Sequence, residues 1–471
     1  MTWHLVAALV TPVATGLLVT FLLTDGPIKN VSTRAGFRVL QMALSIGIGL
    51  GVSSLLFFLF LVFFGRASIA MIACEAAVLI ALLLAGRSRL LRGFKKRPLP
   101  FKGMRLGRPA FVPLWFYALL GVAVLNFILR TMNHPHGGWD AWAMWNMRAR
   151  FLFNGGANWE RAFADVLHWS SADYPLLVST NVARVWTYLG EDALIGPALI
   201  AFLFTFATLA LLVAALHVLR GRKQAYAGGL ILLATAYFIR HGAAQYADVP
   251  LGFYILATLV LLTLQDEAPE TSYSLVWLIG LTAGFAAWTK NEGLLFVVCL
   301  VVARSLVAIL RKSHRTGFAR EARAFLLALA PVLLILLYFK IQWASPNSLM
   351  AGQGLAQTTA RLADLSRPAQ IGQSFFQLML RHDGLVVLLL PAYAGFLGVD
   401  LSRMKRPGVL TSVLVVLLIL CGYFLVFLIT PANLSWHLEV SLKRLLLQLW
   451  PAAIFLSLMI IRPSDEPSDK P

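Results

Sequence analysis

Long apolar runs separated by short polar segments recur from one end of the chain to the other. Most of these runs approach the roughly 20 residues that an α-helix needs to cross about 30 Å of hydrocarbon. The pattern therefore predicts an all-α, polytopic membrane protein. About thirteen spans are expected, at residues 3–24, 39–64, 67–86, 111–130, 196–218, 226–242, 249–265, 274–289, 293–310, 324–342, 384–399, 409–429 and 445–461.

Composition agrees with this pattern. Hydrophobic residues make up 59% of the 471 residues and charged residues only 13%. A soluble domain of this size could not cover its surface with so few polar side chains. Three cysteines, Cys74, Cys299 and Cys421, lie inside apolar runs and predict no disulfide framework.

The net charge of +19 could suit nucleic acid, but the positions of the basic residues argue against such a partner. They gather in short loops between the predicted spans, as expected for cytoplasmic loops under the positive-inside rule. The most basic segment, residues 87–108, is therefore expected inside, with the N-terminus outside and the C-terminal tail inside. Residues 176–190 are too short to cross and carry Arg184 centrally, so we expect a partly embedded helix on the outer side.

The longest polar interruption covers residues 131–175, within an outer, helical region that extends to residue 195. With the predicted topology, other polar segments share its side of the membrane. These are residues 245–251, 289–292, 343–383 and 430–444. Acidic and basic residues thus converge on the predicted outer face, as a site at the membrane surface requires.

Three aspartates at the starts of predicted helices are candidates for chemistry. Each could be a helix cap, because a carboxylate accepts hydrogen bonds from the free amides of the first turn. Asp140 and Asp248 could instead act in catalysis, Asp140 as a general base that accepts the proton of an attacking hydroxyl or amine. Asp173 could cap the following helix, orient an acceptor or hold a divalent cation.

Basic side chains on the same face are candidates for substrate binding. Lys290, Lys443 and Arg444 could extend to the lipid headgroups, or could bind the phosphate of a lipid carrier and stabilise its charge as it leaves. His437 could be a donor or a metal ligand, although an isolated histidine at an interface is more often neither. Tyr174, beside Asp173, completes the candidate substrate-binding set.

Motifs of soluble nucleotide chemistry are absent from the sequence. It contains no P-loop, no GxGxxG in a βαβ context, no GxSxG and no HExxH. No internal repeat is evident, which weakens the interpretation as a transporter built from inverted halves.

Four short motifs follow one another in the predicted outer segments. They are Gly137-Gly138-Trp139-Asp140, Asp173-Tyr174-Pro175-Leu176, Tyr246-Ala247-Asp248-Val249-Pro250-Leu251 and Thr289-Lys290-Asn291-Glu292-Gly293. In their order and spacing over residues 111–310, the chain resembles the GT-C-fold glycosyltransferases that use polyprenyl-phosphate sugars. That group contains the protein mannosyltransferases and the lipid A aminoarabinose transferase. Residues 441–445 resemble a late donor-binding segment more loosely.

The resemblance implies an inverting sugar transfer from a polyprenyl-phosphate carrier to a lipid, glycan or protein acceptor on the non-cytoplasmic face of a bacterial inner membrane. Asp140 corresponds to the catalytic base and Asp248 to a second-loop carboxylate near the acceptor or base. Asp173 corresponds to a position that binds metal in some members, which leaves open whether a divalent metal takes part. Tyr174-Pro175 departs from the usual His-Pro-Pro.

The resemblance also suggests how the chain is organised. Three spans precede the region of resemblance. The chain would then comprise an extension with a basic cytoplasmic loop (1–110), a catalytic core (111–310) and C-terminal helices with outer segments 343–383 and 430–444 (311–471).

Two other functions remain open. A transporter or flippase of lipid-linked or amphiphilic substrates should place ionisable residues inside its spans. Glu75 is the clearest such residue. A scaffold without activity would tolerate replacement of the aspartates.

Overall fold

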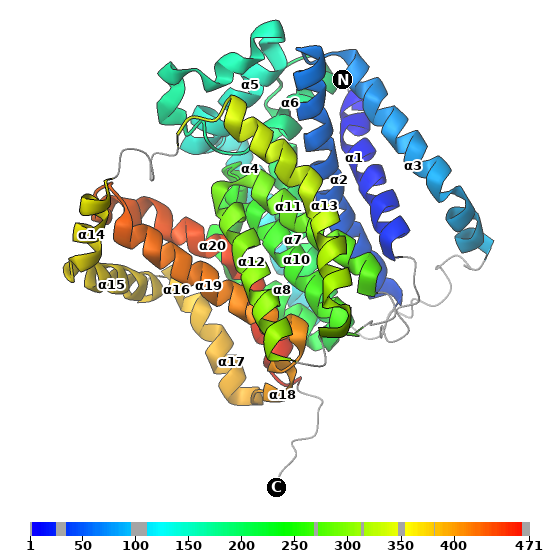
Figure 1. Cartoon of the computed structure of the whole chain (residues 1–471). Coiled ribbons are helices and arrows are strands. Elements are labelled where there is room, and N and C mark those ends of the chain that lie inside the picture. The colour runs from blue at the N-terminus through cyan, green and yellow to red at the C-terminus, as the bar shows by residue number, and fades with distance from the viewer. Residues whose placement is uncertain are drawn as a thin grey trace.

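The computed structural model describes residues 2–24, 34–95, 111–267, 272–311, 315–346, 354–380 and 382–463. Within these ranges the chain is almost entirely helical, with one isolated β-bridge between Val399 and Ile461. The predicted all-α class is confirmed. Figure 1 shows a main bundle of long helices, with the later helices α14 to α20 forming a lobe at its side.

Ten of the described helices are long and apolar enough to cross a membrane, which gives the chain the architecture of an integral, multi-pass membrane protein. They coincide with ten of the predicted spans. They are α1 (Thr2–Thr24), α2 (Arg34–Phe64), α3 (Ile69–Lys95), α4 (Phe111–Asn133), α7 (Ile195–Arg220), α10 (Asp248–Glu267), α12 (Asn291–Leu310), α13 (Arg315–Gln342), α19 (Pro407–Ile429) and α20 (Leu434–Ile460).

The other three predicted spans are shorter or broken, so thirteen continuous spans are not confirmed. The span expected at 226–242 is interrupted at Thr235, whose φ of −78° and ψ of 84° leave the helical region. This break divides it into α8 (Arg222–Ala234) and α9 (Ala236–Ala243). The span expected at 274–289 is the shorter helix α11 (Ser272–Thr289). The span expected at 384–399 is divided into α16 (His382–Leu385), η6 (Val386–Leu388) and α17 (Leu389–Leu397). The short helix α18 (Leu401–Met404) leads into α19.

The predicted outer region 131–195 is helical, as expected, and lies at one end of the bundle (Figure 1). Its last helix, α6, is enclosed by protein, with most of its side chains buried against α1, α2, α5 and α7. The helix is buried between other helices, and its partial embedding on the outer side of the membrane stays a prediction. The elements of the region are η1 (Ala141–Trp145), α5 (Asn146–Asn154), η2 (Gly156–Phe163), η3 (Asp165–Ser170) and α6 (Leu177–Leu189).

A buried ion pair explains how α6 can carry Arg184 at its centre. Arg184 Nε donates to Glu75 Oε1 at 2.6 Å, and the two side chains are 0% and 2% exposed. Tyr188 donates its hydroxyl to the other oxygen of Glu75 at 2.8 Å, and Arg184 Nη1 donates to the carbonyl of Ala8 at 2.7 Å. The residue that sequence alone marked as a transport candidate therefore joins α3 to α6.

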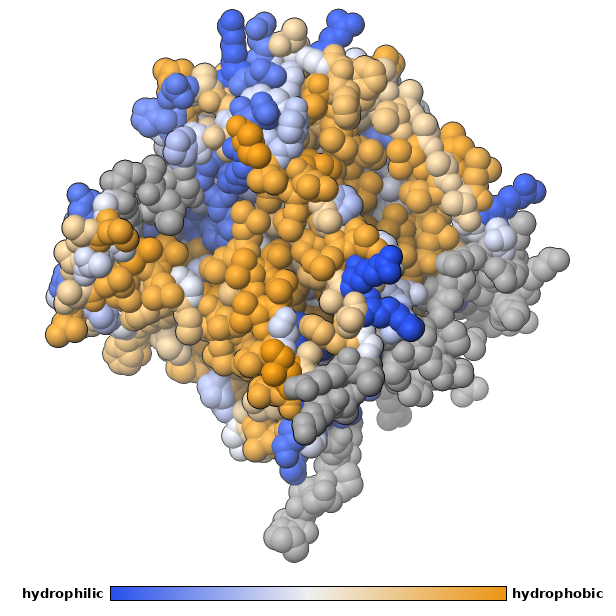
Figure 2. All heavy atoms as spheres, viewed as in Figure 1, coloured by the Kyte–Doolittle hydropathy of each residue, from blue (hydrophilic) through white to orange (hydrophobic). Residues whose placement is uncertain are grey.

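Many apolar side chains of the long helices are exposed on the surface of the molecule. Figure 2 shows a largely hydrophobic face, with hydrophilic residues gathered toward its ends. Large apolar residues such as Leu114, Leu327 and Leu337 are more than half exposed, as expected for a surface that contacts hydrocarbon. The end of the bundle opposite Asp140 carries basic contacts, including Arg220 with the carbonyl of Ile461 and Arg406 with Glu267.

Parts of the predicted basic and outer segments lie outside the described residues. These are residues 96–110 of the basic loop, and residues 347–353 and 381 of segment 343–383. The remainder of segment 343–383 includes α14 (Leu355–Ala363) and α15 (Ser366–Leu380), which pack in the lobe with α19 and α20.

Candidate functional site

A cavity of about 600 Å³ lies where the outer region, the α11–α12 turn, α19 and α20 meet. This volume is within the roughly 300–1,000 Å³ typical of small-molecule sites. One part of the wall is charged and polar, and another is apolar. Its lining includes Trp139, Asp140, Trp169, Tyr174, Lys290, Asn291, Glu292, Leu295, Tyr423, Val426, Ile429, Trp436, His437, Val440, Ser441, Arg444 and Gln448.

Asp140 faces this cavity and does not cap a helix. It occupies the N-cap position of η1, but its side chain makes no capping hydrogen bond. Its Oδ2 instead accepts from Arg444 Nη2 at 2.6 Å, and the Asp140 side chain is 15% exposed. The capping interpretation of Asp140 is therefore wrong, because a strong ion pair takes its carboxylate.

Two glycines allow the Asp140 loop to approach the loop before α10. Gly137 has a φ of +76°, a left-handed conformation that side chains rarely adopt. A Cβ on Gly138 would lie 2.5 Å from the hydroxyl oxygen of Tyr246. The loops are joined by a hydrogen bond from Gly138 N to Ala244 O at 3.0 Å and by one from Gln245 Nε2 to Pro135 O at 3.1 Å.

Asp248 is fully buried and holds the surrounding cations in place. Its Oδ1 accepts from Lys290 Nζ at 2.9 Å and from Gln448 Nε2 at 2.6 Å. Its Oδ2 accepts from Arg444 Nε at 3.2 Å and Nη2 at 3.1 Å, and lies 2.9 Å from His241 Nε2. Both carboxylate oxygens are thus engaged by protein. Asp248 lies behind the cavity wall, where it can position Arg444 and Lys290.

Lys290 and Tyr174 form another part of the polar wall. Lys290 Nζ also pairs with Glu292 Oε1 at 2.8 Å, and lies 5.4 Å from the centre of the Tyr174 ring. Burial opposes the charge on Lys290, but Asp248 and Glu292 together raise its pKa above the ordinary value. Glu292, followed by burial, raises the pKa of the Tyr174 phenol. The wall therefore combines a charged ammonium with a neutral phenol.

Asp173 lies beside the cavity in a separate network. Its Oδ2 accepts from Asn291 Nδ2 at 2.6 Å, and Lys340 Nζ bonds to the Asp173 carbonyl and, at 2.7 Å, to Asn291 Oδ1. Leu176 occupies the N-cap of α6, so Asp173 does not cap that helix. Burial lowers the pKa of the nearby Arg148 to about 10, and the negative charge of Asp173 partly opposes this lowering.

The surroundings of Asp173 do not suit a divalent cation. Its neighbours are an amide and an ammonium group, whereas Mg²⁺ and Ca²⁺ prefer several oxygen ligands. Across the described ranges, no group of three histidine, cysteine, aspartate or glutamate residues is arranged to hold a metal. A metal at Asp173 stays a prediction.

His437 and Lys443 lie on different sides of α20. His437 lines the cavity, with Nδ1 2.9 Å from Thr430 Oγ1 and its ring 5.0 Å from that of Phe427. Lys443 Nζ lies 4.1 Å from the centre of the Tyr237 ring and borders two other cavities. The structure therefore places Tyr174, Lys290, His437 and Arg444 with Asp140 around one cavity, and separates Lys443 from them.

Three residues that contact Asp248 or Lys290 were not among the sequence candidates. Gln448 follows Arg444 by four positions in α20, a spacing that puts both on one helix face and could have identified it. Glu292 lies within the recognised polar turn, and its buried Oε2 accepts no hydrogen bond from the described residues. His241 precedes Asp248 by seven positions across a chain reversal, and no local pattern connects the two.

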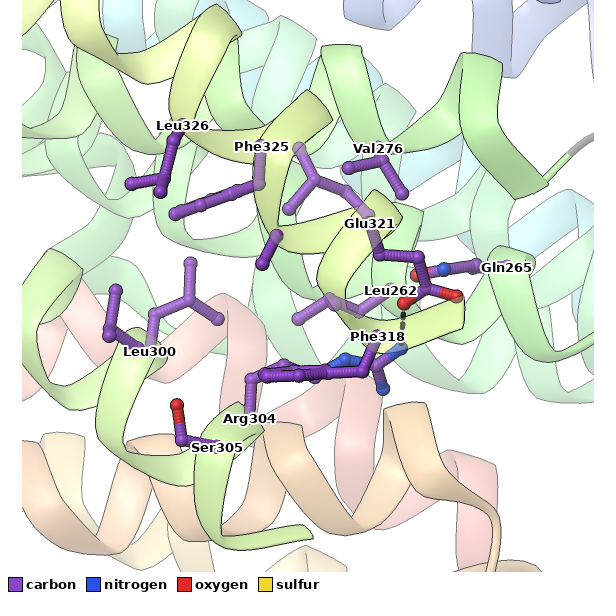
Figure 3. Close-up of a pocket in the computed structure, with 13 residues that line it drawn as sticks. Leu262, Gln265, Val276, Leu300, Arg304, Ser305, Phe318, Glu321, Phe325 and Leu326 are labelled. Carbon is purple, nitrogen blue, oxygen red and sulfur yellow. Dashed lines mark hydrogen bonds and ion pairs between the residues drawn. The ribbon is translucent and has the colours of Figure 1, made fainter. Parts of the chain in front are cut away.

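A smaller cavity of about 120 Å³ lies between α10, α11, α12 and α13 (Figure 3). Its walls are mainly apolar, and at one side Arg304 Nη2 donates to Glu321 Oε2 at 2.9 Å. This Arg–Glu pair supplies the charged residues among its lining residues, whereas Asp140, Lys290, Glu292 and Arg444 all line the larger cavity.

Comparison of the chain with protein-family models, with curated proteins and with solved structures finds no match in any of the three.

Proposed function

We propose that this protein is an integral membrane glycosyltransferase that moves a sugar from a polyprenyl-phosphate carrier to an acceptor on the non-cytoplasmic face. The observation that carries the proposal is the Asp140–Arg444 pair at the wall of a cavity that is charged on one side and apolar on another. A carboxylate and a guanidinium side by side supply a proton acceptor and a phosphate ligand within one site.

The cavity suits the two parts of such a donor. Arg444 can form two parallel hydrogen bonds to a phosphate, and Lys290 adds a second positive charge nearby. The apolar wall, which includes Leu295, Val426 and Val440, offers a surface for the first units of a polyprenyl chain. The same cations would stabilise the negative charge that grows on the phosphate as the sugar leaves.

Asp140 would act as the general base. The acceptor oxygen attacks the anomeric carbon of the sugar and forms the new glycosidic bond, while the bond from that carbon to the phosphate oxygen breaks. The electron pair leaves with the polyprenyl phosphate, and the acceptor proton passes to Asp140. Proton removal of this kind contributes about 10²–10⁴ in rate.

Arg444 would exchange partners during the reaction. In the structure its Nη2 contacts both Asp140 and Asp248. An incoming phosphate would compete with Asp140 for this group, while buried Asp248 continues to hold the guanidinium in position. Donor binding would thereby free the Asp140 carboxylate to accept the proton of the acceptor. Because Asp248 keeps Arg444 in place, the phosphate and the acceptor would be held in a geometry that favours reaction.

One contact bears on the alternative of a transporter or flippase. Glu75, the clearest ionisable residue in a predicted span, is neutralised by Arg184 and shielded from any passage. Asp140, Lys290 and Arg444 instead line a single cavity. This distribution favours surface chemistry over transport.

The test compares membranes containing the wild-type protein with membranes containing Asp140→Asn or Asp192→Asn. Asp192 is a matched control, because its exposed ion pair with Arg150 lies outside the cavity lining. The membranes are supplied with radiolabelled polyprenyl-phosphate sugars and an envelope extract as acceptor. We expect covalent transfer of label with wild type and Asp192→Asn, and a loss of about 10²–10⁴ with Asp140→Asn. Equal transfer by a folded Asp140→Asn variant would eliminate the proposed base, and movement of intact donor without transfer would support the transporter.

A further inference from the structure

A second polar cavity lies on the other side of α20. It measures about 450 Å³ and is enclosed by α15 and α20. Three glutamines on α15, Gln370, Gln373 and Gln377, recur at the spacing of one helix face. Ser435, Glu439 and Lys443 recur every four residues on the facing side of α20, and both sets line the cavity.

The two helices are joined across this cavity. Gln370 Nε2 donates to Ser435 Oγ at 2.6 Å, which links one end of the two polar rows. Gln377 and Lys443, farther along the two rows, also line the cavity. Primary amides both donate and accept hydrogen bonds, so a row of them suits a ligand with several hydroxyl groups.

An apolar cavity adjoins the polar one. It measures about 90 Å³ and includes Met379, Val387, Leu446 and Trp450 in its walls. Leu378 and Lys443 line both cavities, so the two are neighbours with a cation at their junction. Lys443 Nζ lies over the ring of Tyr237, which belongs to the apolar wall.

We propose that these adjoining cavities bind one phospholipid whose headgroup carries a single phosphate and free hydroxyl groups. The first methylene groups of one acyl chain lie in the apolar cavity, the phosphate contacts Lys443, and the hydroxyls contact the glutamine row. Glu439, one helical turn before Lys443, accepts from a hydroxyl and repels a second phosphate. Hydroxyl groups both donate and accept and therefore match the glutamine amides better than the ammonium group of a zwitterionic lipid, which only donates. The Glu439 carboxylate disfavours a lipid with an exposed phosphate monoester.

The lipid site is separate from the proposed catalytic cavity and does not depend on its function. Helix α20 divides them, with Arg444 and Gln448 facing the catalytic cavity and Glu439 and Lys443 facing the lipid site. Lys443 and Arg444 are nevertheless consecutive in the chain. A lipid that holds Lys443 would therefore also restrain the backbone that carries Arg444.

The test is native mass spectrometry of the full chain in detergent, titrated with phosphatidylglycerol, phosphatidylethanolamine or phosphatidic acid. We expect phosphatidylglycerol to bind with the highest affinity. Lys443→Gln should weaken that binding about tenfold or more, because a charge-assisted hydrogen bond is lost. Lys223→Gln, which removes a positive charge outside both cavities, should bind as wild type does.

A second variant avoids dependence on Lys443 alone. Gln377 is exposed on α15, so Gln377→Leu should fold normally and should lower the preference for phosphatidylglycerol over phosphatidic acid. Equal affinity for all three lipids, or unchanged phosphatidylglycerol binding in both variants, would overturn the proposal. Binding of a polyprenyl phosphate in preference to phosphatidylglycerol would also overturn it, since the site would then belong to a lipid-linked substrate.

Discussion

Arg444 Nη2 donates to Asp140 Oδ2 at 2.6 Å, although 304 positions separate the two residues in the chain. The contact joins the last described helix, α20, to the loop that follows α4. Asp248 binds the same guanidinium from the buried side. A carboxylate and a cation are therefore in direct contact at the cavity wall, and a second, buried carboxylate holds the cation.

Replacement of Arg444 by lysine should weaken the interaction with the donor phosphate and leave the stability of the protein almost unchanged. Lysine keeps the charge but cannot bridge Asp140 and Asp248 or bind phosphate through two parallel hydrogen bonds. We expect Arg444→Lys to lower kcat/KM for a polyprenyl-phosphate sugar by about 10²-fold. Thermal unfolding in detergent should change little, because Asp248 retains a positive neighbour. Transfer at the wild-type rate would show that Arg444 does not contact the reacting phosphate.

Removal of the Asp248 charge should destabilise the protein. The fully buried carboxylate compensates Lys290 and Arg444, and loss of one partner from such a cluster costs about 3–5 kcal/mol. Asp248→Asn should therefore lower the free energy of unfolding by that amount. Asp192→Asn is the control, since exposed pairs contribute about 0–1 kcal/mol. Similar unfolding of the two variants would mean that water reaches the Asp248 cluster.

The buried Glu75–Arg184 pair should behave as a unit. Glu75→Gln or Arg184→Met alone leaves one uncompensated polar group inside the protein, at a cost of about 3–5 kcal/mol. The double replacement should cost less than the sum of the two. A double-mutant cycle of unfolding measures this coupling. Additive effects would place the two side chains out of contact in the folded protein.

The charge on Lys290 should resist alkaline pH. Its raised folded pKa means that its contribution to stability is complete below the unfolded value of about 10.4 and is lost as pH rises through the folded value. The stability difference between wild type and Lys290→Met should therefore stay constant from about pH 7 to pH 10. Unfolding measurements across this range check it, and a difference that shrinks near pH 8 would contradict the raised pKa.

The sequence predicted the spans better than the contacts between them. Apolar length is a local property, and it located the ten long helices. The break at Thr235 was not predictable locally. There the threonine hydroxyl accepts from Trp450 Nε1 of α20 at 2.8 Å, a contact that only the folded bundle provides.

The candidate site was predicted only in part, because its contacts also join residues that are distant in the sequence. Topology placed Asp140, Asp248, Lys290 and Arg444 on one side, and the structure brings them together. The capping interpretation failed for Asp140 because a distant arginine competed for its carboxylate. Consecutive residues on a helix point about 100° apart, since 3.6 residues complete a turn. In the structure Arg444 lines the cavity and Lys443 does not, and the sequence did not show which of the two would.

The Glu75–Arg184 contact also sets an order of events during synthesis. Helix α3 leaves the ribosome before α6, so Glu75 enters the bilayer while its partner, 109 positions later, has not yet been made. A lone ionisable group in hydrocarbon costs a few kcal/mol. Helix α3 must therefore remain at the insertion machinery, or shield Glu75 against α1, until Arg184 arrives. The contact between α3 and α6 therefore forms only after Arg184 has been translated.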